Sequence, residues 1–184
     1  MVATAAAAVS ARTERLLETT RLVKAFGGLV AVNKVDFHAS ENEIVGLIGP
    51  NGAGKTTLFN AITGVYPPTS GAIVFKGHAI AGMLPSKVTK LGIARTFQNI
   101  RLFNEMTALE NVMVGQHCRS HTSMLRIIAR TPGAMRAERA IRDKSMELLD
   151  YVGLGGHGAE LAKNLPYGSQ RRLEIARALA TEPS

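Results

Sequence analysis

The sequence predicts a mixed α/β fold, in which a sheet-containing core carries an inserted block of helices. Three observations support this fold class. An apolar run, a glycine-rich loop and a helix-compatible stretch follow one another over residues 44–63. Residues 35–38 alternate apolar and polar side chains, which is the period of a half-buried strand. Residues 104–165 instead place apolar side chains at helical spacing.

Composition indicates a soluble globular protein. The 184 residues suffice for one core with a small appended subdomain, and 46% hydrophobic and 20% charged residues are ordinary values. No apolar run approaches the roughly 18 residues that span a bilayer. Residues 1–15 form an Ala-rich segment without the features of a secretory signal, and we expect a disordered tail. Cys118 is the only cysteine, which excludes an intrachain disulfide and suits a reducing cytosol.

The predicted core covers residues 16–103. Residues 16–37 read as strands joined by a turn at Phe26-Gly27-Gly28, and the run 44–48 reads as another strand. A helix over 57–63 stops at Gly64, residues 72–75 return as a short strand, and 86–91 form a short helix closed by Gly92. Residues 93–98 are expected to be extended.

A helical subdomain is expected over residues 104–165, after which residues 166–184 return to the core. Thr107 and Glu110 form a capping box, and the helix that they open should run to about Cys118. A basic apolar insert, residues 120–133, precedes a longer amphipathic helix that ends at Gly153. Its apolar side comprises Ala137, Ile141, Leu148, Leu149 and Val152.

The formal net charge is +8, and much of the excess lies between Arg119 and Lys144. Three interpretations stay open: a solvated helical face, a surface near anionic lipid headgroups, or a nucleic-acid surface. The first is favoured, because the arginines alternate with aliphatic residues and form no base-stacking platform. His117, Cys118 and His121 make at most half a metal site, and packing or surface roles fit them better.

The segment after the apolar run has the pattern of a phosphate-binding loop. It reads Gly49, Pro50, Asn51, Gly52, Ala53, Gly54, Lys55, Thr56, Thr57. Glycines allow consecutive backbone N–H groups to turn inward around an anion, and the following helix adds its positive N-terminal end. Lys55 would reach the terminal phosphates and Thr56 would hold Mg²⁺. A chance glycine turn is the alternative, and the strand–loop–helix context argues against it.

A second glycine turn precedes a helix near the end of the sequence. It comprises Leu165, Pro166, Tyr167, Gly168, Ser169 and Gln170, and the helix has a buried stripe of Leu173, Ala176 and Ala180. Together with the phosphate loop, this stretch resembles the signature loop of the ATP-binding subunit of ABC transporters. The run 92–107, Gly-Ile-Ala-Arg-Thr-Phe-Gln-Asn-Ile-Arg-Leu-Phe-Asn-Glu-Met-Thr, is most similar to importer subunits for branched-chain amino acids.

The resemblance implies roles for particular residues. Lys55 and Gln98 would be catalytic, Thr56 and Gln98 would contact Mg²⁺, and Phe26 would stack on adenine. The loop 165–170 would bind ATP held by a second ABC ATPase subunit. Phe26 as a core residue and Gln98 as an exposed turn residue are the alternatives.

The resemblance also implies partners and a location. Membrane-spanning permease subunits would bind the ATPase pair, and a substrate-binding protein would act indirectly. The protein would lie in the cytoplasm on the inner face of the cell membrane, without nucleic acid.

Two departures from the family pattern affect the expected chemistry. Pro166 stands where serine is usual, and Ser169 where glutamine or an acid is usual, so contact with the γ-phosphate should be weakened. The Asp-Glu pair after the next strand and the switch histidine have no counterpart before Ser184. We therefore expect a truncated form of a longer subunit that binds ATP but hydrolyses it poorly or not at all, and that is unstable alone.

Two other functions compete with a transport ATPase. An ABC-type ATPase of DNA repair or translation would use the basic surface, but would normally carry a long coiled coil or a zinc site. A non-hydrolytic nucleotide-binding fragment is the other. Nucleotide binding measured together with phosphate release discriminates between these functions.

Overall fold

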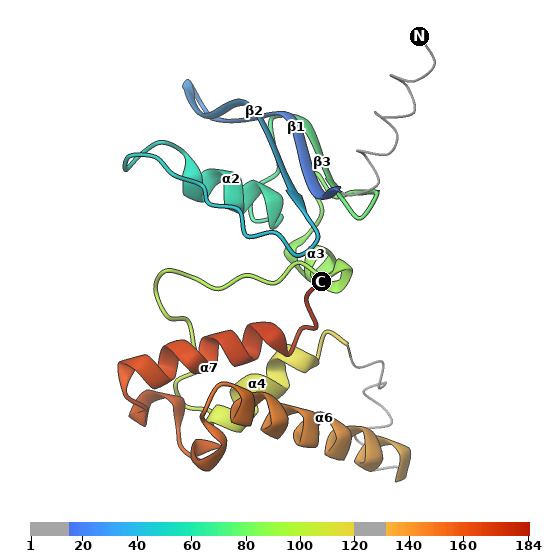
Figure 1. Ribbon diagram of the computed structural model, residues 1–184, viewed down its shortest axis with the longest axis vertical. Helices are drawn as coiled ribbons and strands as arrows, with labels where there is room; N and C mark the ends of the chain where they lie inside the picture. Colours follow the sequence, from blue (N-terminus) through green and yellow to red (C-terminus); the bar gives the residue numbers. More distant parts are fainter. Residues whose placement is uncertain (1–14, 120–131) are drawn as a thin grey trace. The chain divides into compact units, whose positions relative to one another are not determined.

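The computed structural model describes residues 15–119 and 132–184, and the chain divides into two compact units, Met1–Val88 and Thr89–Ser184. Figure 1 shows the strands and helix α2 in the first unit and helices α4, α6 and α7 in the second. The sequence-based division into 16–103, 104–165 and 166–184 places its boundaries elsewhere and stays a prediction.

The first unit contains a four-stranded sheet in the order β2-β1-β3-β4. Its strands are β1 (Arg15–Phe26), β2 (Leu29–Ser40), β3 (Ser70–Phe75) and β4 (His78–Ala79), and every neighbouring pair is antiparallel. The predicted turn is confirmed, because Phe26 pairs with Leu29 and Gly27 adopts a φ of 55°. The predicted strand over 72–75 is confirmed as part of β3.

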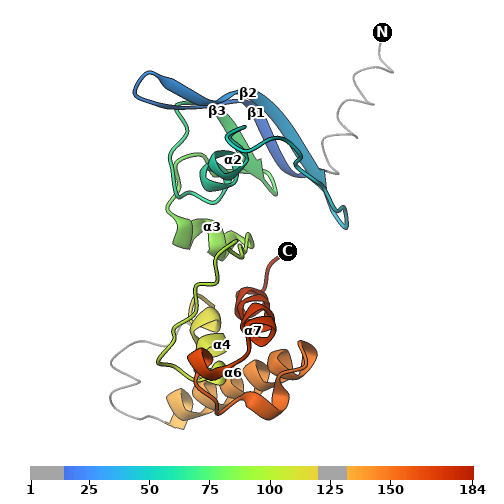
Figure 2. The same cartoon turned by 90° about the vertical axis from the view of Figure 1, so that its left-hand side faces the viewer.

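Helix α2 (Lys55–Ile62) packs against β1 and β2, as Figures 1 and 2 show. The helix buries Leu58, Ala61 and Ile62, and the sheet buries Leu22, Val32, Ile73 and Phe75. The predicted helix over 57–63 is thus confirmed, although it begins two residues earlier. Gly64, with a φ of 75°, follows its C-cap residue Thr63.

The predicted strand over residues 44–48 is wrong. These residues form neither helix nor strand, and the side chains of Ile44 and Ile48 are 100% and 96% exposed. A strand needs a hydrogen-bonded neighbour, and every strand described in the structure pairs within the sheet β2-β1-β3-β4. Apolar character alone therefore does not make this run a strand.

Over its described residues, the second unit is built mainly from three helices. They are α4 (Ala108–Gln116), α6 (Pro132–Tyr151) and α7 (Tyr167–Leu179), and α4 contacts both of the others. Short 3₁₀ turns, Gly155–His157 and Ala162–Asn164, connect α6 to α7, and α3 (Pro85–Leu91) contains the division between the units. Figure 2 shows α4, α6 and α7 side by side. The predicted helices are confirmed in kind, although α4 ends at Gln116.

The core of this unit joins α4, α6 and α7 with the segments between them. Ala108, Leu109, Val112, Leu149, Leu154, Ala162, Leu165, Leu173, Ala176 and Ala180 form one buried cluster. This confirms the predicted stripe on α7. Gly115 permits the close approach of the two helices, because a Cβ there would overlap the carbonyl oxygen of Arg177. The capping box is also confirmed: the Thr107 hydroxyl accepts from the Glu110 amide, and the Glu110 carboxylate accepts from the Thr107 amide.

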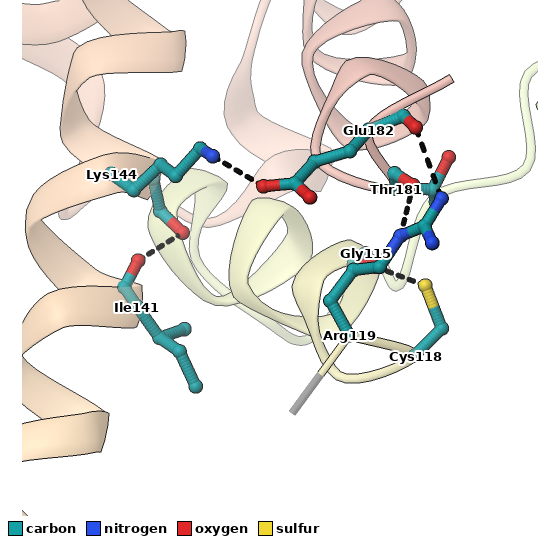
Figure 3. A network of polar contacts seen from close by, with 8 residues as sticks. Gly115, Cys118, Arg119, Ile141, Lys144, Thr181 and Glu182 are labelled. Atoms are coloured by element: carbon teal, nitrogen blue, oxygen red, sulfur yellow. Dashed lines mark hydrogen bonds and ion pairs between the residues drawn. The ribbon is translucent and has the colours of Figure 1, made fainter. Parts of the chain in front are cut away.

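Arg119 closes the C-terminal end of α7, as Figure 3 shows. Its Nε donates to the carbonyl of Thr181 at 2.8 Å and its Nη2 to the carbonyl of Glu182 at 3.0 Å. Its Nη1 donates to the carbonyl of Lys90 at 2.9 Å. Thr181 and Glu182 lie just beyond the end of α7, so one guanidinium fastens the segment that follows the helix. The adjacent ion pair of Lys144 and Glu182 ties α6 to the same end.

Candidate functional site

The glycine-rich loop lies directly at the N-terminus of α2. Gly52 and Gly54 both have a φ of 84°, a conformation that side chains with a Cβ disfavour. Gly54 is the N-cap residue of α2, and its carbonyl accepts the amide of Leu58 at 2.9 Å. The amide of Ala53 donates to the carbonyl of Pro50 at 3.3 Å, which curls the loop. The glycines therefore shape the turn that the sequence predicts.

Lys55 folds back over this loop. Its Nζ donates to the carbonyl of Gly49 at 2.5 Å and to that of Pro50 at 2.7 Å. The ammonium thus lies above the loop, next to the N-terminal end of α2. Phosphate oxygens are stronger acceptors for an ammonium than neutral carbonyls, because the hydrogen bond is then charged on both sides.

The first turn of α2 provides further positive potential. It contains no acidic residue, and its leading backbone N–H groups have no partner one turn earlier in the helix. Thr56 is exposed and Thr57 is half-buried. The loop, Lys55 and the helix end together offer the positive charge and N–H donors that a polyphosphate would need.

The donor set also fits a magnesium ion that arrives with phosphates. Mg²⁺ prefers oxygen ligands and is commonly held by one or two protein groups plus substrate phosphates. The exposed hydroxyl of Thr56 is such a group. Among the described residues, no group of three or more His, Cys, Asp or Glu side chains could hold a metal by itself.

Phe26 lies at the end of β1 and is 41% exposed. Its ring meets that of Tyr66 edge-on, with centroids 5.3 Å apart and planes at 83°. The Nζ of Lys24 lies 4.9 Å from the Phe26 centroid and 5.9 Å from that of Tyr66, and it donates to the carbonyl of Pro67. Phe26 is therefore a partly open aromatic residue, not a core one. Sequence reasoning missed Lys24 and Tyr66, since no spacing links them.

Gln98 belongs to the second unit and is exposed. Its backbone carbonyl accepts Nη2 of Arg171 at 2.6 Å, and the neighbouring Phe97 is bonded through its amide to Glu174 and through its carbonyl to Arg171. The loop around Gln98 is thus attached to α7. Arg171 and Glu174 were not singled out from the sequence, although their spacing of three places them on one helix face.

The second glycine turn forms the start of α7. Leu165 is buried, Tyr167 is 69% exposed and Gly168 is exposed. The amides of Ser169 and Gln170 donate to the carbonyl of Pro166, so those of Tyr167 and Gly168 precede the first bonds of the helix.

The side chains of Ser169 and Gln170 are hydrogen-bonded within the second unit. Ser169 is 8% exposed, and its Oγ accepts Nη2 of Arg172 at 3.1 Å. Nε2 of Gln170 donates to the carbonyl of Leu165 at 3.0 Å. The exposed backbone amides of this turn and the Tyr167 hydroxyl therefore remain for contact with an anion.

The structure gathers the sequence-predicted residues into two groups. The first unit carries the phosphate loop and Phe26, and the second carries Gln98 and the turn 165–170. The nucleotide, magnesium and signature roles of these residues stay predictions.

The structure describes only some of the residues considered for a metal site and for the basic segment. The thiol of Cys118 donates to the carbonyl of Gly115 at 3.3 Å, as Figure 3 shows, and His121 lies outside the described residues. Arg136, Arg139 and Arg142 on α6 are exposed, in agreement with a solvated helical face, whereas Arg126 and Arg130 also lie outside the described residues. No helix among the described residues is long and apolar enough to cross a membrane.

Similarity to known proteins agrees with this site. The profile of the ABC transporter family matches residues 32–184. The high-affinity branched-chain amino acid transport ATP-binding protein LivG of Salmonella typhimurium is 46% identical over 168 residues, which are 91% of this chain and 66% of LivG. The corresponding protein BraF of Pseudomonas aeruginosa has the same identity and coverage. The chain thus spans slightly less than two thirds of the length of these relatives.

Solved structures give the same result. The ADP conformation of MJ1267, an ATP-binding cassette of an ABC transporter, superposes with a TM-score of 0.77 at 33% identity, over 93% of this chain and 66% of that one. The mixed α/β fold predicted from the sequence is therefore that of an ABC ATPase cassette. The glycine loop, the helix end behind it and this likeness lead to one conclusion: the chain belongs to the ABC transporter family.

Proposed function

We propose that this chain binds Mg²⁺ and ATP through residues 49–57 as the nucleotide-binding part of an ABC importer subunit. The observation that carries the proposal is the ammonium of Lys55, which lies over the glycine loop at the N-terminus of α2. Lys55 would contact the terminal phosphates, backbone amides of the loop would enclose them, and Phe26 would stack on the base. Thr56 and Gln98 would contact the metal ion.

Branched-chain amino acids are the proposed cargo. The support is the identity to LivG and BraF, both named as branched-chain amino acid transport ATP-binding proteins. The importer would contain membrane-spanning permease subunits and a separate substrate-binding protein, which would select the amino acid. The ATPase would then lie on the inner face of the cell membrane.

A second ATPase subunit is proposed to complete the site. The start of α7 supports this arrangement, because Tyr167 and Gly168 are exposed and their amides precede the first helical bonds. Each ATP would lie between the phosphate loop of one subunit and this turn of the other. ATP would then hold the dimer closed, and loss of the γ-phosphate would release it, a switch known from other nucleotide enzymes.

Calorimetry with Mg-ATP and Mg-ADP tests nucleotide binding. Charge-assisted hydrogen bonds are worth about 1.5–3 kcal/mol, so Lys55→Ala should weaken ATP binding by roughly 10- to 100-fold. Lys87→Ala is the matched control, since Lys87 is an exposed lysine on α3. Absence of binding heat, or equal affinity of the Lys55→Ala variant, would overturn the proposal.

Phosphate release measured on the same samples tests turnover. Binding without release indicates that this chain alone holds nucleotide, as the sequence suggests. Release that disappears in Lys55→Ala shows a complete hydrolytic site. Uptake of labelled leucine by cells whose full subunit carries Lys55→Ala tests the cargo; unchanged leucine uptake would contradict branched-chain amino acid import.

A further inference from the structure

We propose that Arg171 and Glu174 are positioning residues that fix the backbone of Phe97 and Gln98 to α7. The start of α7 and the residue expected to contact Mg²⁺ would thereby move as one body. We call the contacts of Arg171 and Glu174 with Phe97 and Gln98 the bracket. Its effect on catalysis rests on the proposed ATPase function, whereas the contacts themselves belong to the second unit alone.

Two charged side chains of α7 hold both sides of one peptide segment. Nη1 of Arg171 donates to the carbonyl of Phe97 and Nη2 to that of Gln98, each at 2.6 Å. Oε1 of Glu174 accepts the amide of Phe97 at 3.1 Å. The other oxygen of Glu174 pairs with Nη1 of Arg171 at 3.1 Å, which closes the bracket. A planar guanidinium suits this arrangement, because its fixed fork can serve two carbonyls at once.

The bracket acts on a segment that lacks regular structure. Residues 93–103 form neither helix nor strand, so their backbone groups find no ladder of partners. The guanidinium groups of Arg95 and Arg101 both lie over the ring of Phe97, at 5.1 and 5.2 Å from its centroid. Phe97 is therefore held through both its backbone and its ring. The exposed side chain of Gln98 extends from the next residue, whose carbonyl is also fixed.

The burial of Glu174 makes its partners in the bracket necessary. Glu174 is 2% exposed, and a buried carboxylate is tolerated only when it is paired and hydrogen-bonded. Arg171 and the Phe97 amide are the partners that stabilise it. Because α7 begins with the turn 167–170, a displacement of that turn would reach Gln98 through a single rigid helix.

Hydrogen exchange of the full chain tests the bracket directly. In Arg171→Ala the Phe97 amide should exchange about tenfold faster at least, whereas amides inside α4 keep their rates. Glu174→Gln keeps a carbonyl acceptor for that amide but loses the ion pair, so an intermediate rate is expected. Arg171→Lys keeps the positive charge but loses the two-pronged guanidinium. It replaces Arg171→Ala in this experiment if the alanine variant does not fold.

Arg119→Ala is the matched control. Arg119 also donates to backbone carbonyls, near the other end of α7, and these carbonyls belong to Lys90, Thr181 and Glu182. Loss of these bonds should lower the stability of the unit without faster exchange at Phe97. Equal acceleration by Arg119→Ala and Arg171→Ala, or none in Arg171→Ala, would overturn the bracket.

The effect on catalysis is measured with the protein assembled in its transporter. Arg171→Ala should lower kcat for ATP and leave KM unchanged, and Arg171→Lys should restore part of it. Equal kcat of wild type and Arg171→Ala would overturn the positioning role. Lys55→Ala separates the proposed ATPase function from the bracket. If Lys55→Ala leaves ATP binding unchanged, the proposed function is refuted, but the exchange rate of the Phe97 amide still tests the bracket.

Discussion

Gly54 lies so close to Ala31 that a Cβ on Gly54 would overlap the Ala31 carbonyl oxygen. Gly54 also has a φ of 84°, and it is the last residue before α2. The contact therefore sets how the phosphate loop rests on β2. Position 54 therefore requires glycine for two reasons, the left-handed backbone conformation and the lack of room for a Cβ.

Gly54→Ala should destabilise the first unit by about 2 kcal/mol or more, since a left-handed residue costs about 1–2 kcal/mol before any clash. Urea unfolding measures the loss, and calorimetry should show weaker ATP binding. Gly52→Ala is the matched control, because Gly52 has the same φ but no atom within 4 Å of an added Cβ. Equal losses in both variants would show that the contact with Ala31 has no effect.

Phe26→Leu should weaken ATP binding while leaving the binding of inorganic tripolyphosphate unchanged. Stacking of a base on an aromatic ring is worth about 1–3 kcal/mol, and tripolyphosphate has no base. Calorimetry with both ligands measures the difference. Phe103→Leu, which replaces a similarly exposed ring of the second unit, should have no such effect. Equal weakening of both ligands would contradict base stacking.

Asn111→Leu should destabilise the second unit by about 2–4 kcal/mol, because it leaves buried backbone groups without partners. Asn111 is fully buried, accepts the amide of Phe103 and donates to the carbonyls of Phe103 and Thr107. Thermal unfolding measures the loss. Asn164→Leu, at an exposed position, should change the melting temperature little. A small effect at position 111 would mean that water replaces the lost bonds.

The pKa of the Glu110 carboxyl lies below its ordinary value of 4.5. The main cause is the hydrogen bond that the carboxylate accepts from the Thr107 amide, and the second is the one that it accepts from the Thr107 hydroxyl. A lowered folded-state pKa contributes stability above the ordinary pKa, and this contribution disappears as the pH falls through the lowered value. Glu110→Gln should remove that dependence. Urea midpoints of the two proteins should therefore converge as the pH drops below about 4.5. A constant difference would contradict a role of the charge.

The exposed apolar run at residues 44–48 should promote self-association. Ile44 and Ile48 are almost fully exposed, and contiguous apolar surface of this kind drives aggregation. Ile44→Glu with Ile48→Glu should lower the light scattering of concentrated samples without lowering the unfolding midpoint. Leu84→Glu, which changes an exposed leucine elsewhere, controls for added charge. A monodisperse, cooperatively melting wild-type sample would refute the expectation.

The sequence by itself determined the features that depend on neighbouring residues. The hairpin at Gly27, the capping box of Thr107 and Glu110, and the helix after the phosphate loop follow from local backbone preferences and hydrogen bonds. Residues 49–57 could likewise be predicted as an anion site, because glycines, a lysine and a helix start are contiguous in the chain.

Only the tertiary structure decided the rest. The run 44–48 failed as a strand, since pairing depends on a neighbour that local composition does not specify. The contacts of Gly54 with Ala31, and of Phe97 with Arg171 and Glu174, join residues 23 to 77 positions apart. Such contacts arise from packing, so no periodicity or spacing in the sequence announces them.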